Sequence, residues 1–414
     1  MTLPFGEFVS RAHAHGTLVV QPRMGFSDPE LMREGLAATK AAAATTVGTL
    51  TLDSYTRVRD LDSAREAVAA GVALNGYPIT THPHATSLRV LDGIRGADFP
   101  VQVRHGSARP EHIIDALVAL GLDATEGGPV SYCLPYGRVR LRDAVASWRT
   151  SCALLARAED MGGVPHLESF GGCMLGQLCP PSMLVAISVL EGVFFARHGL
   201  RSVSLSYAQQ TSPIQDRQAV AALHHLAAEL LPGVDWHIVL YAYMGVYPRT
   251  HDGALGLLSA AARLAAESGA ARLIVKTAAE AHRIPTIADN VEALETAARA
   301  AATAHRTAPE TTDTEVYAEA RALVHTVLGL HEDPGEALLI AFARGLLDIP
   351  FCLHPDNAGR TRAYVDDAAW LRWSDTGSLP FGAAPSTRRR LTSTDLLAAL
   401  SHVQRAYDRE GSSP

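Results

Sequence analysis

Residues 272–305, RLIVKTAAEAHRIPTIADNVEALETAARAAATAH, show the pattern that decides the fold. The segment begins with a short run of branched apolar side chains, Arg272–Lys276, and ends with a long alanine-rich amphipathic stretch, Val291–His305. A short apolar run is typical of a buried strand, and an amphipathic stretch is typical of a helix packed on one face. A strand followed by a helix is the unit from which parallel α/β proteins are built.

The same alternation extends back to about residue 17. Predicted strands cover Thr17–Gln21, Thr46–Leu52, Val72–Leu74, Val101–Arg104, Ala124–Glu126, Val164–Leu167, Arg201–Leu205, His237–Tyr241 and Arg272–Lys276. Predicted helices cover Glu30–Ala44, Ser63–Ala70, Glu111–Leu120, Arg142–Ala158, Met183–His198, Ile214–Leu230, Ala254–Ser268 and Val291–His305. About eight such units favour a (β/α)₈ TIM barrel over a Rossmann sheet. The candidate strands exceed the eight places of a barrel, and the pattern does not identify the extra one.

A different pattern follows the last predicted barrel helix. The polar segment Thr307–Asp313 predicts a hinge, after which Val316–Leu330 and Glu336–Leu346 predict two helices. Asp348–Phe381 is rich in Pro, Gly and Asp and predicts an irregular or short-stranded part. We therefore expect a catalytic barrel over residues 1–305 and a C-terminal helical and irregular extension over residues 306–414, packed on the barrel.

Composition and charge exclude several classes of protein. The 414 residues carry a formal net charge of −7, and 47% of them are hydrophobic, which is typical of a folded protein and argues against disorder. The basic run Arg388–Arg390 is short, so we expect neither nucleic acid nor a membrane as a partner. The N-terminus lacks the pattern of a signal peptide, and five cysteines without a CxxC motif favour a cytoplasmic protein with reduced thiols.

Arginines follow three of the predicted strands. Arg23 comes after LVVQP, Arg57 closes TLTLDSYTR, and Arg104 closes PVQVR. Functional residues of a barrel gather at the carboxyl ends of its strands, so three guanidiniums at one mouth predict a deep anion site. The alternative is that each arginine pairs with an acidic residue in a neighbouring loop.

The segment EGGPVSYCLPY, residues 126–136, adds Glu126, Tyr132 and Tyr136 at the end of another predicted strand. Next to an anion site, a carboxylate suits an ammonium group and a phenol hydroxyl can orient a carboxylate. Three arginines and one glutamate carry a charge of +2, which favours an amino dicarboxylate over a phosphate or a sugar. The alternative is an ordinary glycine-rich turn.

Lys276 and Glu280 lie four residues apart at a strand-to-helix transition. The chain has only two lysines, Lys40 and Lys276, and uses arginine nearly everywhere else. A lysine at a strand end therefore indicates a site that requires the slender ammonium group of lysine. Three interpretations stay open from the residues alone: a Schiff-base lysine, a pair that holds a polar cofactor, and a surface ion pair.

Taken together, the motifs resemble those of the large, or epsilon, subunit of glutamate mutase, also called methylaspartate mutase. The matching segments run in the same order along nearly the whole chain: QPRMG (21–25), LDSYTR (52–57), LNGYP (74–78), QVRHG (102–106), EGGPVSYCLPY (126–136), CPPSM (179–183), IVKTAAEAHRIPT (274–286), LDIPF (347–351) and DNAGR (356–360). The resemblance implies a (β/α)₈ barrel. It also implies an adenosylcobalamin-dependent isomerase that interconverts L-glutamate and (2S,3S)-3-methylaspartate by a radical carbon-skeleton rearrangement.

The resemblance also assigns roles to residues. The family's substrate-binding arginines fall on Arg23, Arg57 and Arg104, and its ammonium-binding carboxylate falls on Glu126. The remaining positions divide into two sets, the substrate and catalytic positions Tyr132 and Tyr136 and the cofactor positions Gly25, Thr51, Asn75, Lys276 and Glu280. The expected catalytic residues are Glu126, which would ease fragmentation by partly deprotonating the ammonium, and Tyr132 beside it.

Cobalamin binding in this family requires a second chain. The sequence contains no DxHxxG motif, because His251-Asp252-Gly253 has the wrong order and spacing. The resemblance therefore implies a small cobalamin-binding partner subunit that carries this motif and the cobalt-ligating histidine, so no metal ligand is expected in this chain. It also implies a homodimer of this chain and a heterotetramer with the partner.

Two segments depart from the family. The amino-acid sequences of residues 206–216 and 240–248 differ from those of the corresponding segments in the family, and both segments lie at the ends of predicted strands. A related B12-dependent mutase acting on another amino diacid therefore stays open. So do a B12-independent barrel lyase that uses Lys276 as a Schiff base and a non-catalytic subunit, although the arginines and the Lys276–Glu280 pair argue against the last.

Overall fold

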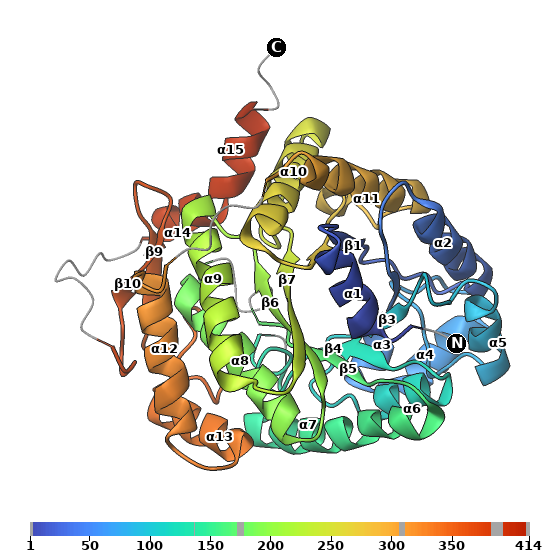
Figure 1. Ribbon diagram of the computed structural model, residues 1–414, viewed down its shortest axis with the longest axis horizontal. Helices are drawn as coiled ribbons and strands as arrows, with labels where there is room; N and C mark the ends of the chain where they lie inside the picture. Colours follow the sequence, from blue (N-terminus) through green and yellow to red (C-terminus); the bar gives the residue numbers. More distant parts are fainter. Residues whose placement is uncertain (1–2, 136, 172–177, 306–310, 382–391, 411–414) are drawn as a thin grey trace.

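A closed barrel of eight parallel strands forms the centre of the molecule (Figure 1). The computed structural model describes residues 3–135, 137–171, 178–305, 311–381 and 392–410. The strands are β1 (Val19–Gln21), β2 (Gly48–Thr51), β3 (Val101–Arg104), β4 (Ala124–Glu126), β5 (His166–Glu168), β6 (Ser202–Ala208), β7 (Asp235–Tyr241) and β8 (Arg272–Ile274). They pair in sequence order, β1 pairs with β8, and a parallel bridge between Val20 and Thr46 joins β1 to the strand region of β2. The predicted (β/α)₈ fold is confirmed.

The superfluous strand candidate is Val72–Leu74, and its prediction was wrong. These residues follow α4 (Leu61–Ala69) in an irregular segment, and the side chain of Val72 is 56% exposed. A short apolar run forms a barrel strand only if tertiary packing buries it, and here nothing does. The weaker candidate Ala124–Glu126 is a true strand, fully buried between β3 and β5.

Helices surround the barrel, as the alternating pattern predicts (Figure 1). They are α2 (Pro29–Ala41), α3 (Ser54–Val58), α5 (His84–Leu91), α6 (Glu111–Ala119), α7 (Leu141–Ala156), α8 (Pro181–Arg197), α9 (Pro213–Leu230), α10 (His251–Ser268) and α11 (Ile287–Ala302), together with α4. Two short 3₁₀ helices, η1 (Arg157–Met161) and η2 (Ala278–Ala281), lie among them. Among the described residues, no helix is both long and apolar enough to cross a bilayer.

The helix α8 is buried on all sides. Every residue from Pro181 to Phe195 is buried, because the barrel lies on one side and α12 (Glu315–Leu328) packs on the other. The C-terminal part continues with α13 (Pro334–Arg344), an antiparallel pair of β9 (Arg362–Val365) and β10 (Leu371–Asp375), α14 (Ser393–Leu400) and α15 (His402–Glu410). The two predicted helices and the short-stranded part are therefore present.

A helix that the sequence analysis did not predict, α1 (Phe5–Ala14), closes one end of the barrel. Phe5 and Val9 are fully buried against the barrel residues Val19 and Ala271. A side chain on Gly6 would place its Cβ 2.4 Å from the hydroxyl of Ser202, so only glycine permits this approach. Because α1 lies near the amino ends of the strands, the carboxyl ends are left for the site.

The barrel interior contains a polar layer above α1. Arg272 of β8 is fully buried and pairs with Glu168 of β5, and its guanidinium also donates to the side-chain oxygen of Gln21. The amide of Gln21 donates in turn to Gln102 Oε1 at 2.8 Å. A buried ion pair is stable only when its remaining hydrogen-bonding groups also have partners, and this network supplies partners for most of them. The pair places the Glu168 carboxylate directly beneath the site.

Candidate functional site

A cavity of about 770 Å³ opens at the carboxyl ends of the barrel strands. Its walls come from the first five strands and the loops that follow them, together with Met244 after β7. The lining residues that bear on the chemistry are Arg23, Thr51, Arg57, Arg104, His105, Glu126, Tyr132 and Phe170. The structure thus brings together the predicted arginines, Glu126 and Tyr132. Tyr136 lies outside the described residues.

Arg104 and Glu126 form a buried ion pair on the cavity floor. Arg104 Nε lies 2.7 Å from Glu126 Oε2, and the two side chains are 4% and 2% exposed. The guanidinium also lies 5.7 Å from the ring centre of Phe170 and 5.3 Å from that of Tyr241, which are cation–π distances. Burial opposes the charge of Arg104, but the Glu126 carboxylate outweighs it and holds the arginine pKa well above its ordinary value.

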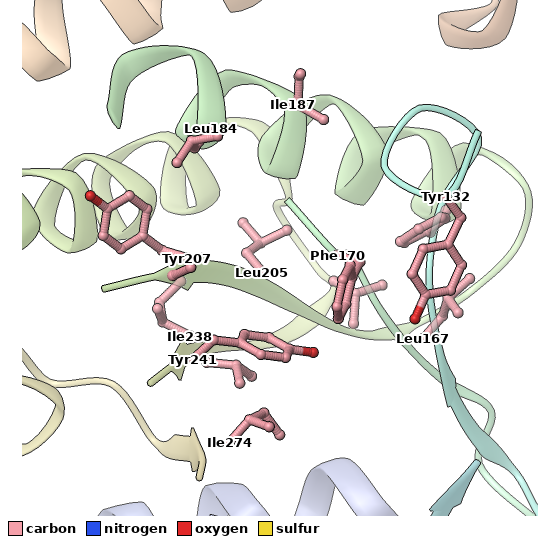
Figure 2. Close-up of a cluster of buried hydrophobic side chains, with 14 of the residues drawn as sticks. Tyr132, Leu167, Phe170, Leu184, Ile187, Leu205, Tyr207, Ile238, Tyr241 and Ile274 are labelled. Carbon is pink, nitrogen blue, oxygen red and sulfur yellow. The ribbon is translucent and has the colours of Figure 1, made fainter. Parts of the chain in front are cut away.

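Two phenols converge on the same carboxylate. Tyr132 donates its hydroxyl to Glu126 Oε1, and Tyr241 Oη lies 2.9 Å from Glu126 Oε2 while also hydrogen-bonding to Glu168. Figure 2 shows Tyr132, Phe170 and Tyr241 in one cluster, with ring centres of neighbouring pairs 4.9 and 5.1 Å apart. Burial and the Glu126 charge raise the pKa of Tyr132, so its hydroxyl stays a proton donor.

Arg57 differs from the other two arginines. It projects from α3, whose N-cap Asp53 accepts a hydrogen bond from the backbone of Thr56 at 3.0 Å. Its guanidinium donates to the carbonyl of Leu52 at 3.1 and 3.3 Å, and in the described part of the chain it has no carboxylate partner. Arg57 therefore retains an uncompensated charge on the cavity wall.

Arg23 lines two cavities and pairs with a residue that also lines a third. Its Nη1 pairs with Glu280 Oε2 at 2.5 Å, which links a predicted substrate residue to a predicted cofactor residue. Arg23 and Thr51 also line a second cavity of about 580 Å³ with Gly25 and Asn75. Glu280 continues into a third cavity of about 610 Å³. The second cavity shares lining residues with each of the other two, so the three form one extended site.

Lys276 lines the third cavity. Its Nζ lies 4.2 Å from the ring centre of Tyr247 and 3.5 Å from the carbonyl of Gly245, and the residue is 8% exposed. Glu280 is held by a capping box, in which the backbone of Thr277 donates to Glu280 Oε1 at 3.2 Å. The turn after β8 therefore presents the ammonium of Lys276 and the carboxylate of Glu280 to the same space.

The wall between the first two cavities contains a close backbone approach. A Cβ on Gly25 would lie 2.1 Å from the carbonyl oxygen of Thr51, so the loop after β1 requires glycine here. Thr51 Oγ1 is buried without a hydrogen-bond partner among the described residues. Asn75 accepts a hydrogen bond from the backbone of Ser54 at 2.9 Å.

His105 supports the site from behind. Its ring packs 5.2 Å from that of Tyr132 and 5.9 Å from that of Trp148, and its Nδ1 accepts a hydrogen bond from the backbone of Ser107. Burial and the charges of neighbouring His112 and arginines lower the pKa of His105 to about 3, so the ring is neutral. A neutral ring packs behind Tyr132 without adding charge.

Glu191 of α8 holds the turn that carries Tyr132. Its carboxylate accepts hydrogen bonds from the backbones of Val130 and Ser131 at 3.0 and 2.9 Å and from the Ser131 hydroxyl at 2.9 Å. Burial raises the pKa of Glu191 to about 7. Its sequence signal was weak, since it is one acidic residue in an apolar helix.

The sequence analysis missed Glu168 and Tyr241. Both are the last residues of their strands, β5 and β7, so the rule that found Arg104 and Glu126 would also have found them. No cluster of three or more potential metal ligands occurs within the described ranges.

The barrel and its arginine-lined cavity define a (β/α)₈-barrel protein whose candidate site lies at the carboxyl ends of the strands, where the enzymes of this fold carry their active sites. The family described as "Methylaspartate mutase E chain (MutE)" matches residues 2–393. The chain belongs to this family.

Curated relatives support the same assignment. The chain is 29% identical to a glutamate mutase epsilon subunit from Escherichia coli O157:H7. The match extends over 389 residues and covers 89% of this chain and 79% of the relative. It is 30% identical to that of Desulfitobacterium hafniense over 91% of this chain and 81% of the relative. It is 33% identical to the glutamate mutase epsilon subunit of Halobacterium salinarum, over 80% of this chain and 71% of the relative.

Proposed function

We propose that this chain is the catalytic large subunit of an adenosylcobalamin-dependent glutamate mutase, an isomerase that interconverts L-glutamate and 3-methylaspartate. The observation that carries the proposal is the buried cluster of Arg104, Glu126 and Tyr132 in one cavity with Arg57, which pairs with no carboxylate of the described ranges. The family membership and the names of the relatives support the same reaction. We further propose that residues 1–305 form the catalytic barrel and that residues 306–414 form an extension packed on it.

The charges around the site match an amino dicarboxylate. Arginines outnumber carboxylates in the lining of the first cavity, where Arg23, Arg57 and Arg104 lie with Glu126. An amino dicarboxylate carries a net charge of −1 near neutral pH. Burying two carboxylates costs much free energy unless charged donors are paired with them, and the arginines provide those donors.

Each polar residue has a definite part in binding. Arg57 offers two parallel N–H groups to one substrate carboxylate, and Arg104 offers its Nη groups to the other because its Nε is already bound to Glu126. Glu126 accepts the substrate ammonium and moves a proton to or from it. Tyr132 holds Glu126 in place through its hydroxyl. The family resemblance alone supports Tyr136, outside the described residues, as a further substrate contact.

The second and third cavities fit the adenosyl part of the cofactor. Lys276 and Glu280 present a donor and an acceptor to a ribose diol. Gly25, Asn75 and Thr51 line the second cavity, and the Thr51 hydroxyl has no hydrogen-bond partner among the described residues. Bound adenosylcobalamin would supply the radical chemistry of the rearrangement. The protein binds and aligns the substrate and keeps water out.

The cobalamin itself is proposed to reach the barrel with a partner. A small cobalamin-binding subunit carrying DxHxxG would cover the mouth of the barrel, and two copies of each chain would form a heterotetramer in the cytoplasm. The epsilon-subunit name of the relatives supports a partner subunit.

The test is reconstitution. This chain is mixed with a cobalamin-binding small subunit, adenosylcobalamin and L-glutamate, and 3-methylaspartate is measured by chromatography. Product that depends on all four components supports the proposal. A stable, folded complex that forms no 3-methylaspartate contradicts it.

A further inference from the structure

One wall of the third cavity comes from the C-terminal helix α15. Gln404 of this helix lines the cavity together with Lys276 and Glu280, although it lies more than a hundred residues away in the sequence. Figure 1 shows α15 beside α10 and α14, away from the C-terminal helices α12 and α13. The family match ends at residue 393, so α15 lies beyond the part of the chain that the family model describes.

The helix is firmly attached to the loop before α10. Asp408 Oδ1 accepts hydrogen bonds from the backbones of Arg249 and Thr250 at 2.9 and 3.0 Å and from the Thr250 hydroxyl at 3.0 Å. Val403 packs with Tyr247 in a buried apolar cluster at the base of α10. These contacts fix the position of α15 relative to the cavity.

Gln404 is connected to Lys276 through one residue. Its Nε2 donates to the carbonyl of Tyr247 at 3.0 Å. The ring of Tyr247 lies 4.2 Å below the ammonium of Lys276, and its hydroxyl donates to the Lys276 carbonyl at 3.3 Å. The carboxamide of Gln404 is therefore held at the same cavity as the ammonium.

The groups around the third cavity suit a nucleoside. The cavity is lined by two cationic groups, on Lys276 and Arg249, and by the Glu280 carboxylate. The Gln404 carboxamide and the imidazole of His282 complete the polar lining. Ribose hydroxyls and base edges each need both donors and acceptors, and a carboxamide is the side-chain group that offers both. The Glu280 carboxylate in the wall accepts hydrogen bonds from ribose hydroxyls but repels a simple anion, so the mixed lining favours a nucleoside.

We propose that α15 completes the nucleoside pocket of this protein and that Gln404 hydrogen-bonds to the ribose or base of the bound nucleoside. This inference rests on the proposed function, since the nucleoside is the adenosyl group of the cofactor. The pocket is thus built from the barrel and from a helix outside the family-matched residues.

The test compares two cobalamins on the complex of the full chain with its cobalamin-binding partner. The Kd of adenosylcobalamin and of methylcobalamin, which lacks the nucleoside on cobalt, is measured by absorbance titration for the wild type and for Gln404→Met. Methionine retains the length of glutamine and removes its hydrogen bonds. We expect Gln404→Met to weaken adenosylcobalamin about three- to tenfold, the effect of one hydrogen bond, and to leave methylcobalamin unchanged.

Two further variants complete the design. Arg409 is exposed on the same helix, so Arg409→Ala is the control and should change neither Kd. Gln404→Ala should reproduce the loss seen with methionine, and the melting temperature of each variant shows whether it is folded. An unchanged adenosylcobalamin Kd in the folded Gln404 variants overturns the inference, and so does an equal loss for both cobalamins.

The outcome separates this inference from the proposed reaction. If the Gln404 variants lose the preference for adenosylcobalamin but the wild type forms no 3-methylaspartate, the nucleoside pocket stands and the reaction is wrong. If the wild type forms 3-methylaspartate and the variants bind both cobalamins normally, the reaction stands and the role of Gln404 is wrong.

Discussion

Replacing Arg57 by lysine tests substrate binding with little effect on folding. Arg57 is half-buried, donates to the Leu52 carbonyl and, in the described part of the chain, has no carboxylate partner. The substitution keeps the positive charge on the cavity wall. It leaves no buried carboxylate unpaired, so the free energy of unfolding should change by less than about 1 kcal/mol.

The expected loss follows from the geometry of the guanidinium. Arginine can donate two parallel hydrogen bonds to a substrate carboxylate, whereas lysine donates from a single nitrogen. One charge-assisted hydrogen bond contributes about 1.5–3 kcal/mol, so Arg57→Lys should lower kcat/KM about 10- to 100-fold.

The assay measures kcat and KM for L-glutamate in the reconstituted complex, with thermal denaturation in parallel. The control is Arg65→Lys, because Arg65 is also an arginine but is exposed and pairs with Asp62 outside the cavity. A kcat/KM within twofold of the wild type would refute the proposed role of Arg57. A loss of activity accompanied by a large fall in melting temperature would show a structural role instead.

Three further predictions concern residues in and around the site. Arg104→Met leaves the buried Glu126 without its ion-pair partner and should lower the free energy of unfolding by about 3–5 kcal/mol in urea denaturation; a change below 1 kcal/mol contradicts the pairing. Because the pKa of Glu191 is raised to about 7 in the folded protein, the folded state binds more protons than the unfolded state above the ordinary glutamate pKa. The wild type therefore loses stability as the pH rises from the ordinary glutamate pKa towards 7, whereas Glu191→Gln, which has no carboxyl group to titrate, does not. The free energy of unfolding of Glu191→Gln should accordingly rise relative to that of the wild type by about 3 kcal/mol across that range. Parallel plots of the free energy of unfolding against pH for the two proteins would be inconsistent with the shift. Gly25→Ala places a Cβ 2.1 Å from the Thr51 carbonyl and should weaken adenosylcobalamin binding or stability measurably, whereas wild-type values for both would exclude the close approach.

Much of the fold could be predicted because its signals are local. Apolar runs and amphipathic stretches report strands and helices residue by residue, and their alternation identifies the barrel. Val72–Leu74 has the local signal of a strand, but burial depends on neighbours elsewhere in the chain, and Val72 has none that cover it. The helix α1 was also not predicted, because its packing beneath the barrel depends on residues far away in the sequence.

The site residues divide in the same way. The position after a strand predicted Arg23, Arg57, Arg104 and Glu126, because all parallel strands of a barrel end at one mouth. The pairing of Arg23 with Glu280, 257 residues apart, could not be predicted, since no local pattern states which charges will meet.

By itself, the sequence determined the order of strands and helices, the family, and which residues stand at the strand ends. Only the tertiary structure decided the charge that each of them presents to a ligand. Arg104 and Glu126 neutralise each other in a buried pair, whereas Arg57 keeps its charge. It also decided that Gln404, at the far end of the chain, lines the cavity of Lys276. The physical reason is that electrostatic and hydrogen-bonding partners are set by distance in space, and folding brings distant segments together.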